Sequence, residues 1–125
     1  MSYITDLGGV PGSFLALPAV FSRGGTLLVP SSAINVVIWQ APFPCTVTNV
    51  RGYAVGAAGT TVNARKNSSL THLASDLTLT STGTWLDGGA VQNVSYSTGD
   101  EMEIMLTGIG GSPSEIAVQL DLTRP

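Results

Sequence analysis

The sequence predicts an all-β protein: a β-sandwich of the jelly-roll type with an extended N-terminal arm. Eight or nine short stretches rich in β-branched and apolar residues follow one another, separated by Gly, Pro, Ser and Asn. Their spacing of about 8 to 12 residues is typical of sandwiches and barrels. Several stretches alternate apolar and polar residues with a period of two, and no stretch repeats apolar residues at helical spacing over ten residues. Immunoglobulin-type packing is the neighbouring option, disfavoured by the missing Cys-Trp-Cys core.

The composition bounds the class of protein. A chain of 125 residues is long enough for one domain with a real core and too short for two. Charged residues make up 10% of the chain, against about 25% in typical soluble domains. Because a free-standing monomer usually carries more charge for solubility, the composition indicates assembly with other subunits. We expect a homo-oligomer.

Charge and cysteine content exclude several partners. The net charge is −3, and only Arg65-Lys66 is a basic pair, so we expect no nucleic-acid binding. Cys45 is the single cysteine; it excludes an intrachain disulfide, and its strand-entry position predicts a small buried apolar residue. No run reaches the ~18 to 20 apolar residues of a membrane span, and the N-terminus lacks a secretory signal. We expect synthesis in a cytoplasm and no membrane partner.

Residues 1–25 are predicted to form the extended arm. Glycine pairs in LGGVPG and SRGG flank the apolar segment SFLALPAVF, and Pro18 opposes a continuous helix through it. Exposed apolar side chains on an arm are a liability unless they dock. The arm can pack on its own domain as an edge strand or reach a neighbouring subunit, and both options stay open. As candidate interface residues we take the large apolar side chains of this segment and one tryptophan: Phe14, Leu15, Leu17, Val20, Phe21 and Trp39.

The sandwich domain is predicted over residues 26–125. Residues 26–29 form a short apolar run, and residues 33–40 are apolar on both faces, as in a strand covered on both sides or lying at an interface. Residues 45–57 form the longest predicted strand, with Gly52 and Gly56 as bend or bulge positions. Residues 60–73, TTVNARKNSSLTHL, predict a hairpin: a strand, a tight turn at Asn67-Ser68-Ser69 and a return strand. In its first strand, Val62, Ala64 and Lys66 are expected on one side and Asn63 and Arg65 on the other.

The second half continues the pattern. Strands are predicted over residues 77–80, 84–86 and 90–97. Residues 101–107 place Met102, Ile104 and Leu106 on one face, opposite Glu101, Glu103 and Met105. Residues 116–123 alternate most clearly, with Ile116, Val118, Leu120 and Leu122 facing one way.

No catalytic constellation is recognisable. His72, the single histidine, has Ser68, Ser69 and Asp76 nearby in sequence, but no nucleophile motif such as GxSxG is present. We interpret His72 as a surface residue and expect no enzymatic activity. Asp100, Glu101 and Glu103 cluster at a turn without matching a calcium-loop pattern. We interpret them as a solvated strand edge and expect neither a metal ion nor a cofactor.

Three aromatic residues are candidates for stacking on sugars. Tyr53, Trp39 and Trp85 have flat apolar faces of the kind exposed in carbohydrate-binding modules. Trp39 lies in an apolar run, which favours core or interface. Trp85 precedes Asp87-Gly88-Gly89 and is the better candidate for an exposed loop position.

From about residue 47 to residue 123, the chain resembles the small jelly-roll capsid decoration (cement) and head-fibre proteins of tailed bacteriophages. The resemblance lies in GTTVNARKNSSLTHL, where Lys66-Asn67-Ser68 replaces the usual Lys-Asn-Gly, in the hairpin STGDEMEIMLTGIG, and in the closing strand EIAVQLDLTRP. It implies a structural virion protein on the outer capsid surface, often a trimer, that clamps the major capsid protein. A receptor- or glycan-binding module of a fibre or tail tip is the alternative.

Overall fold

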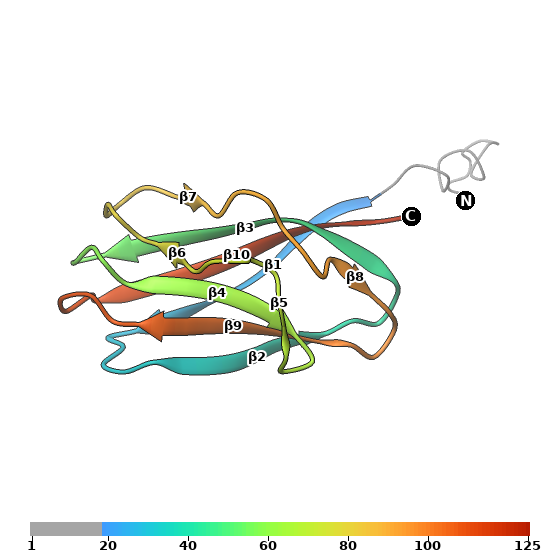
Figure 1. Cartoon of the computed structure of the whole chain (residues 1–125), viewed down its shortest axis with the longest axis horizontal. Helices are drawn as coiled ribbons and strands as arrows, with labels where there is room; N and C mark the ends of the chain where they lie inside the picture. Colours follow the sequence, from blue (N-terminus) through green and yellow to red (C-terminus); the bar gives the residue numbers. More distant parts are fainter. Residues whose placement is uncertain (1–18) are drawn as a thin grey trace, which may run out of the picture.

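The computed structural model describes residues 19–125, which form two five-stranded antiparallel sheets packed face to face (Figure 1). Sheet A has the order β1-β10-β3-β7, with β8 also pairing with β3; sheet B has the order β2-β9-β4-β5, with β6 also pairing with β4. All regular structure in this part of the chain is strand. The predicted β-sandwich is confirmed.

The ten strands agree in order with those predicted from sequence. Their bounds are β1 Ala19–Leu28, β2 Ile34–Gln40, β3 Cys45–Val55, β4 Thr61–Lys66, β5 Leu70–Thr71, β6 Leu77–Thr78, β7 Leu86–Asp87, β8 Ser95–Tyr96, β9 Glu101–Gly108 and β10 Glu115–Arg124. Strands β5 to β8 have two residues each, shorter than the runs expected at 77–80 and 90–97. Residues 19–125 contain no helix long and apolar enough to cross a bilayer.

Strand pairing follows the winding of a jelly roll. β1 pairs with β10, β2 with β9, β3 with β7 and β8, and β4 with β5 and β6, all antiparallel. The first half of the domain therefore pairs with the second half in reverse order. A long antiparallel hairpin wound into two sheets has this order, which is the jelly-roll arrangement.

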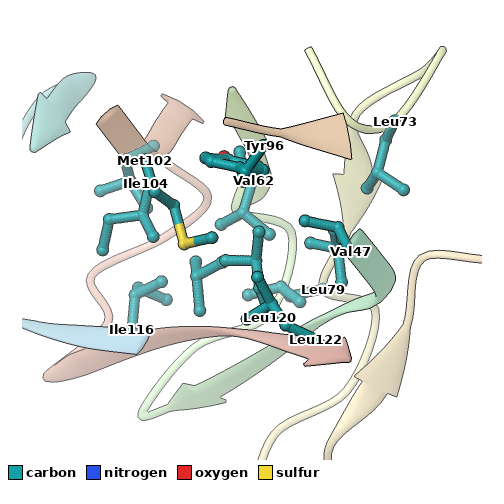
Figure 2. Packing of buried hydrophobic residues seen from close by; sticks show 14 of the residues in the cluster. Val47, Val62, Leu73, Leu79, Tyr96, Met102, Ile104, Ile116, Leu120 and Leu122 are labelled. Carbon is teal, nitrogen blue, oxygen red and sulfur yellow. The ribbon is translucent and has the colours of Figure 1, made fainter. Parts of the chain in front are cut away.

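The core lies between the sheets, and the two alternating strands β9 and β10 contribute to it with the faces predicted. Met102 and Ile104 of β9 meet the inner face of β10 across the sandwich (Figure 2). Leu106 of β9 is buried in the same cluster. The inward residues of β10 are at most 2% exposed: Ile116, Val118, Leu120 and Leu122. Cys45 joins this core with 3% exposure, as expected for a small apolar residue.

The predicted hairpin is present, and its turn lies at the predicted residues. Asn67 and Ser68 have φ angles of 53° and 64°, so both central residues are left-handed, as in a type I′ turn. The turn closes with a hydrogen bond of 3.2 Å from the Ser69 amide to the Lys66 carbonyl. Asn63 is buried, because the segment after β5 covers it; its side-chain amide donates to the Leu73 carbonyl and the Asp76 carboxylate.

The first strand begins earlier than predicted. Residues 19–25, which the sequence pattern assigns to the arm, form part of β1 and pair with β10 from Ala19↔Arg124 to Gly25↔Val118. For these residues the edge-strand option holds. The glycines that mark a boundary in the sequence lie inside this strand. At Gly24 a larger residue would not fit, because a Cβ would lie 2.6 Å from the Val118 carbonyl oxygen. Residues 1–18, the remainder of the predicted arm, lie outside the described residues.

Gly52 has a packing role and is not the bulge of β3. A Cβ there would approach Leu79 Cδ2 to 2.5 Å, so the glycine lets the two sheets come together. The irregularity in pairing occurs instead at Asp121/Leu122, opposite the β3 segment around Thr48. Gly56 has a φ of 93° and follows the end of β3, in agreement with a bend.

Candidate functional site

The first candidate for a functional site is the side of the sandwich formed by β1 and β2, which we call the open edge. Both strands stand at the ends of their sheets, and the side of each strand that faces away from its partner pairs with no strand of residues 19–125. Arg23 of β1 bridges them: its guanidinium carbon lies 5.1 Å from the ring centroids of both Phe21 and Trp39. A charged side chain pointing inward is one way in which edge strands avoid uncontrolled pairing.

Three aromatic rings fill one end of the open edge. Phe21 lies 5.9 Å from Trp39 and 5.6 Å from Phe43, and Trp39 lies 6.1 Å from Phe43, all in edge-to-face geometry. The guanidinium of Arg124 covers Phe43 at 4.2 Å. These rings pack against the core without being fully buried. The end of the open edge is therefore an aromatic surface covered by two cations.

The predicted interface residues separate into three groups. Phe21 and Trp39 are brought together at the open edge. Val20 points to the outer face of sheet A and is 76% exposed. Phe14, Leu15 and Leu17 lie outside the described residues, so the structure does not place them.

Sequence reasoning missed further apolar residues of the open edge. Val37 is 54% exposed and Ile34 is 47% exposed, both on β2. The apolar run of residues 33–40 contains the signal that could have identified them, because one interpretation of that run was a strand at an interface. No part of residues 19–125 covers the outer face of β2. The alternative prediction for this run, a strand covered on both faces, therefore does not hold within the described residues.

His72 is not a surface residue, and the interpretation from sequence is wrong on this point. Its side chain is 0% exposed, because the chain before β8 folds over it. Nε2 lies 2.7 Å from the hydroxyl of Tyr96 and Nδ1 lies 3.2 Å from the carbonyl of Gln92. Both ring nitrogens are thus engaged, and neither Ser68, Ser69 nor Asp76 is a hydrogen-bond partner of the ring. The arrangement is structural, and burial lowers the pKa of the imidazole.

Glu103 is also buried, which corrects its interpretation as part of a solvated edge. β9 is an inner strand of sheet B, and Glu103 is 4% exposed. Arg65 donates from Nη2 and Nε to Oε1 at 2.9 and 3.0 Å, and the Ser68 hydroxyl donates to Oε2. The hydrogen bonds from Ser68 and Arg65 lower the pKa of Glu103 against the opposing effect of burial. No group of three or more metal-ligating side chains occurs within residues 19–125.

Tyr53 and Trp85 form a second candidate site, on the outer face of sheet A. Their ring centroids are 5.1 Å apart with planes inclined at 49°, and Trp85 is 45% exposed. The expectation that Trp85 occupies an exposed loop position is confirmed. Trp39 belongs to the open edge, so the three aromatic candidates do not form one site.

Comparison with known proteins identifies the fold. No protein-family profile and no curated protein matches the sequence. Among solved structures, a chain of the cyanophage Pam1 capsid asymmetric unit has a TM-score of 0.54 with 16% identity, over 86% of each chain. A chain from infectious bursal disease virus strain Gx has a TM-score of 0.45 and 14% identity, over 86% of this chain and 33% of that chain. The likeness to the Pam1 chain shows that the two chains share a fold.

Proposed function

We propose that this protein is a structural virion subunit: a capsid decoration protein that binds the outer surface of the shell, contacts the major capsid protein and stabilises the contacts between capsomers. The open edge is the observation that carries the proposal. It combines strand sides that pair with no other strand of residues 19–125 with exposed apolar residues, in a chain of low charge content. Such a surface is suited to lasting contact with another protein.

The fold likeness supports a virion role. The Pam1 chain belongs to a capsid asymmetric unit, and the match extends over 86% of both chains, so the whole sandwich is shared. Fold alone does not determine function. The argument for binding therefore rests on the open edge, and the likeness favours a viral shell as the partner.

A partner strand added to β1 would extend sheet A and place its own side chains beside Val20 on the outer face. The main-chain groups of an edge strand supply affinity in such β-augmentation, and alternate side chains supply specificity. Trimerisation is the oligomeric state proposed here. Repeating the contact in each subunit multiplies its contribution to shell stability.

The test is a binding assay on capsids of the same virus assembled without this protein. The purified full-length protein is added, and the capsids are sedimented and then heated with and without it. We expect saturable binding and a higher disruption temperature. We expect light scattering on the free protein to give the molar mass of a trimer.

Paired variants locate the contact. Val37→Asp puts a charge on the open edge and is expected to weaken capsid binding at least about tenfold, since it forces a carboxylate into a desolvated contact. Leu70→Asp is the matched control, because Leu70 is 42% exposed on β5, at the opposite end of sheet B from β2. Absence of capsid binding by the wild-type protein would overturn the proposal. An equal loss of capsid binding in both variants would show that the open edge is not the contact surface.

A truncation tests the arm separately. Removal of residues 1–18 leaves β1 intact, whereas removal of residues 1–25 would also delete most of the pairing with β10. We expect the shorter truncation to fold and to bind capsids more weakly. Undiminished binding would show that the open edge acts without the arm.

A further inference from the structure

We propose that the outer face of sheet A carries a saccharide site, in which Tyr53 and Trp85 stack against a neutral hexopyranose unit of a glycan. The site lies in a groove between the aromatic pair and the outer residues of β1 and β10. It does not depend on the virion role and uses a different surface from the aromatic cluster of the open edge.

The aromatic pair is held by the backbone on both sides. The amide of Gly83 donates to the Ala54 carbonyl at 2.9 Å, and Leu86 pairs with Gly52 in the ladder between β7 and β3. Residues 83–86 therefore run alongside β3, and Trp85 comes to lie against Tyr53. A φ of 72° at Gly83 allows the turn that starts this segment. The rings are thus positioned before any ligand arrives, which reduces the entropy lost on binding.

The groove beside the rings is open because its floor is made of small residues. Gly24 on β1 and Ala117 on β10 leave a hollow of about 420 Å³. This volume lies within the roughly 300–1,000 Å³ typical of small-molecule sites. Gly24 cannot be larger, because a Cβ would collide with the Val118 carbonyl oxygen at 2.6 Å. The depth of the groove is therefore set by the packing of β1 on β10.

Several polar residues line the groove, and their side chains have hydrogen-bonding groups without a partner among residues 19–125. Glu115 and Thr26 also line it, and neither side chain forms a hydrogen bond or ion pair with another of residues 19–125. Gln119 donates its amide to Asp121 at 3.1 Å. Its side-chain carbonyl accepts from no group in the described part of the chain. Two acceptors and a hydroxyl beside an aromatic surface match the alternating hydroxyl and C–H groups of a pyranose ring.

The chemistry favours a neutral sugar. One face of a hexopyranose exposes C–H bonds, which are attracted to the electron-rich faces of aromatic rings. Glu115 repels sialic acid, uronic acids and phosphate. Arg51 lies opposite Gln119 in the sheet but is engaged in an ion pair with Asp121, so it does not offset that repulsion. A neutral hexose that hydrogen-bonds through its hydroxyl groups satisfies both the rings and the acceptors.

The test begins with the full-length protein on an array of neutral gluco-, manno- and galacto-oligosaccharides together with sialylated glycans. We expect neutral oligosaccharides to bind and sialylated ones to bind more weakly. The strongest neutral oligosaccharide is then titrated by calorimetry. We expect Trp85→Ala and Tyr53→Ala each to weaken binding about tenfold, as loss of one stacking surface predicts. Trp85→Phe keeps an aromatic face and is expected to retain most of the affinity.

Two controls separate binding from folding. Leu70→Ala removes an exposed apolar group from sheet B and is expected to leave sugar affinity unchanged. In the wild-type protein, the indole N–H signal of Trp85 is expected to shift on sugar addition, while that of Trp39, the only other tryptophan, stays in place. Failure of every neutral oligosaccharide to bind, a preference for sialylated glycans, or an unmoved Trp85 signal would each overturn the proposal.

Discussion

Nε2 of His72 and the hydroxyl of Tyr96 form a buried hydrogen bond of 2.7 Å that joins the chain after β5 to β8. On the other side of the ring, Nδ1 faces the Gln92 carbonyl, which can only accept. The proton therefore resides on Nδ1, and Nε2 accepts from the Tyr96 hydroxyl. The neutral imidazole satisfies both partners, and a second proton would disturb one of them.

The first prediction is a loss of stability in mild acid. Burial lowers the pKa of folded His72 from its usual 6.5, so below pH 6.5 the unfolded chain binds more protons than the folded one. Stability is then fully present above that pH and decreases as the pH falls toward the folded pKa, by up to about 1.4 kcal/mol per pH unit. Urea denaturation of the wild-type protein at pH 8, 7, 6 and 5 measures the slope.

His72→Gln is the control for this slope. The shifted carboxyl groups titrate at lower pH, because the pKa values of Asp100, Glu103 and Asp121 lie below usual values of 3.8 to 4.5. The positive charge of Lys66 also contributes to the lowered pKa of His72. We expect the variant to be less stable at pH 8 but flat from pH 8 to pH 5. A wild-type protein with no slope between pH 7 and pH 5 would contradict the prediction.

The second prediction concerns the hydroxyl of Tyr96. Tyr96→Phe keeps the ring, which is 3% exposed and packs against His72 and Trp39, but leaves Nε2 without a donor. An unsatisfied buried acceptor costs about 1–3 kcal/mol. Urea denaturation at pH 8 measures this loss. Tyr53→Phe is the matched control, since the hydroxyl of Tyr53 has no hydrogen-bond partner among the described residues and its loss is expected to change stability little.

The sequence predicted the regular part of the fold well and the buried polar contacts poorly. The alternation of β9 and β10 is local, because a strand with one buried face must repeat with a period of two. The burial of His72 depends on residues 90–96 folding over it, which no local pattern records. Likewise, Glu103 is buried because β4 supplies Arg65 from 38 positions away. The Tyr53–Trp85 pair depends on the register of β7 along β3, a long-range feature.

The short strands β5 to β8 show a different limit. Their sequences alternate well enough to predict longer strands, but part of their backbone hydrogen bonding is met by side chains. Asn93 donates to the Thr71 carbonyl at 2.8 Å, and the amide of Leu73 donates to the Asn63 side chain at 3.1 Å. Side chains of this kind compete with ladder formation. Period-two alternation alone cannot show at which residues side chains, and not a neighbouring strand, bind the backbone.

The third prediction concerns the ion pair between Arg65 and Glu103. Their side chains are 22% and 5% exposed, so Arg65→Met leaves a nearly buried carboxylate with one remaining donor, Ser68. We expect a loss of about 3 kcal/mol at pH 7, because a buried charge without its partner is strongly destabilising. The loss is measured by urea denaturation.

The double variant Arg65→Met, Glu103→Met tests the cause. Replacing both charges by apolar groups of similar size is often neutral or stabilising. We expect the double variant to recover most of the stability lost in the single one. A double variant that is as unstable as the sum of the two single variants would show that packing, and not the uncompensated charge, accounts for the loss.

The last prediction concerns Val29, which has a φ of 46° in the turn after β1. The left-handed conformation is unfavourable for a β-branched residue, and a non-glycine residue held there costs of order 1–3 kcal/mol. Its side chain is 75% exposed and gains little from packing, while its amide donates to the Ser114 carbonyl at 2.8 Å. Val29→Gly keeps that hydrogen bond and relieves the strain. We expect a net gain of about 1 kcal/mol in the free energy of unfolding, after the greater backbone entropy of glycine in the unfolded chain is subtracted.

Leu28→Gly is the matched control for this gain. Leu28 is 72% exposed and is the last residue of β1, so it is similar in exposure but lies in an ordinary strand conformation. There glycine only adds unfolded-state entropy, and we expect a loss of about 0.5–1 kcal/mol. Opposite signs at two neighbouring, similarly exposed positions would isolate the backbone conformation as the cause. A loss at both positions would mean that the Val29 side chain contributes contacts that outweigh its strain, which would place the turn after β1 among the surfaces that hold the domain together.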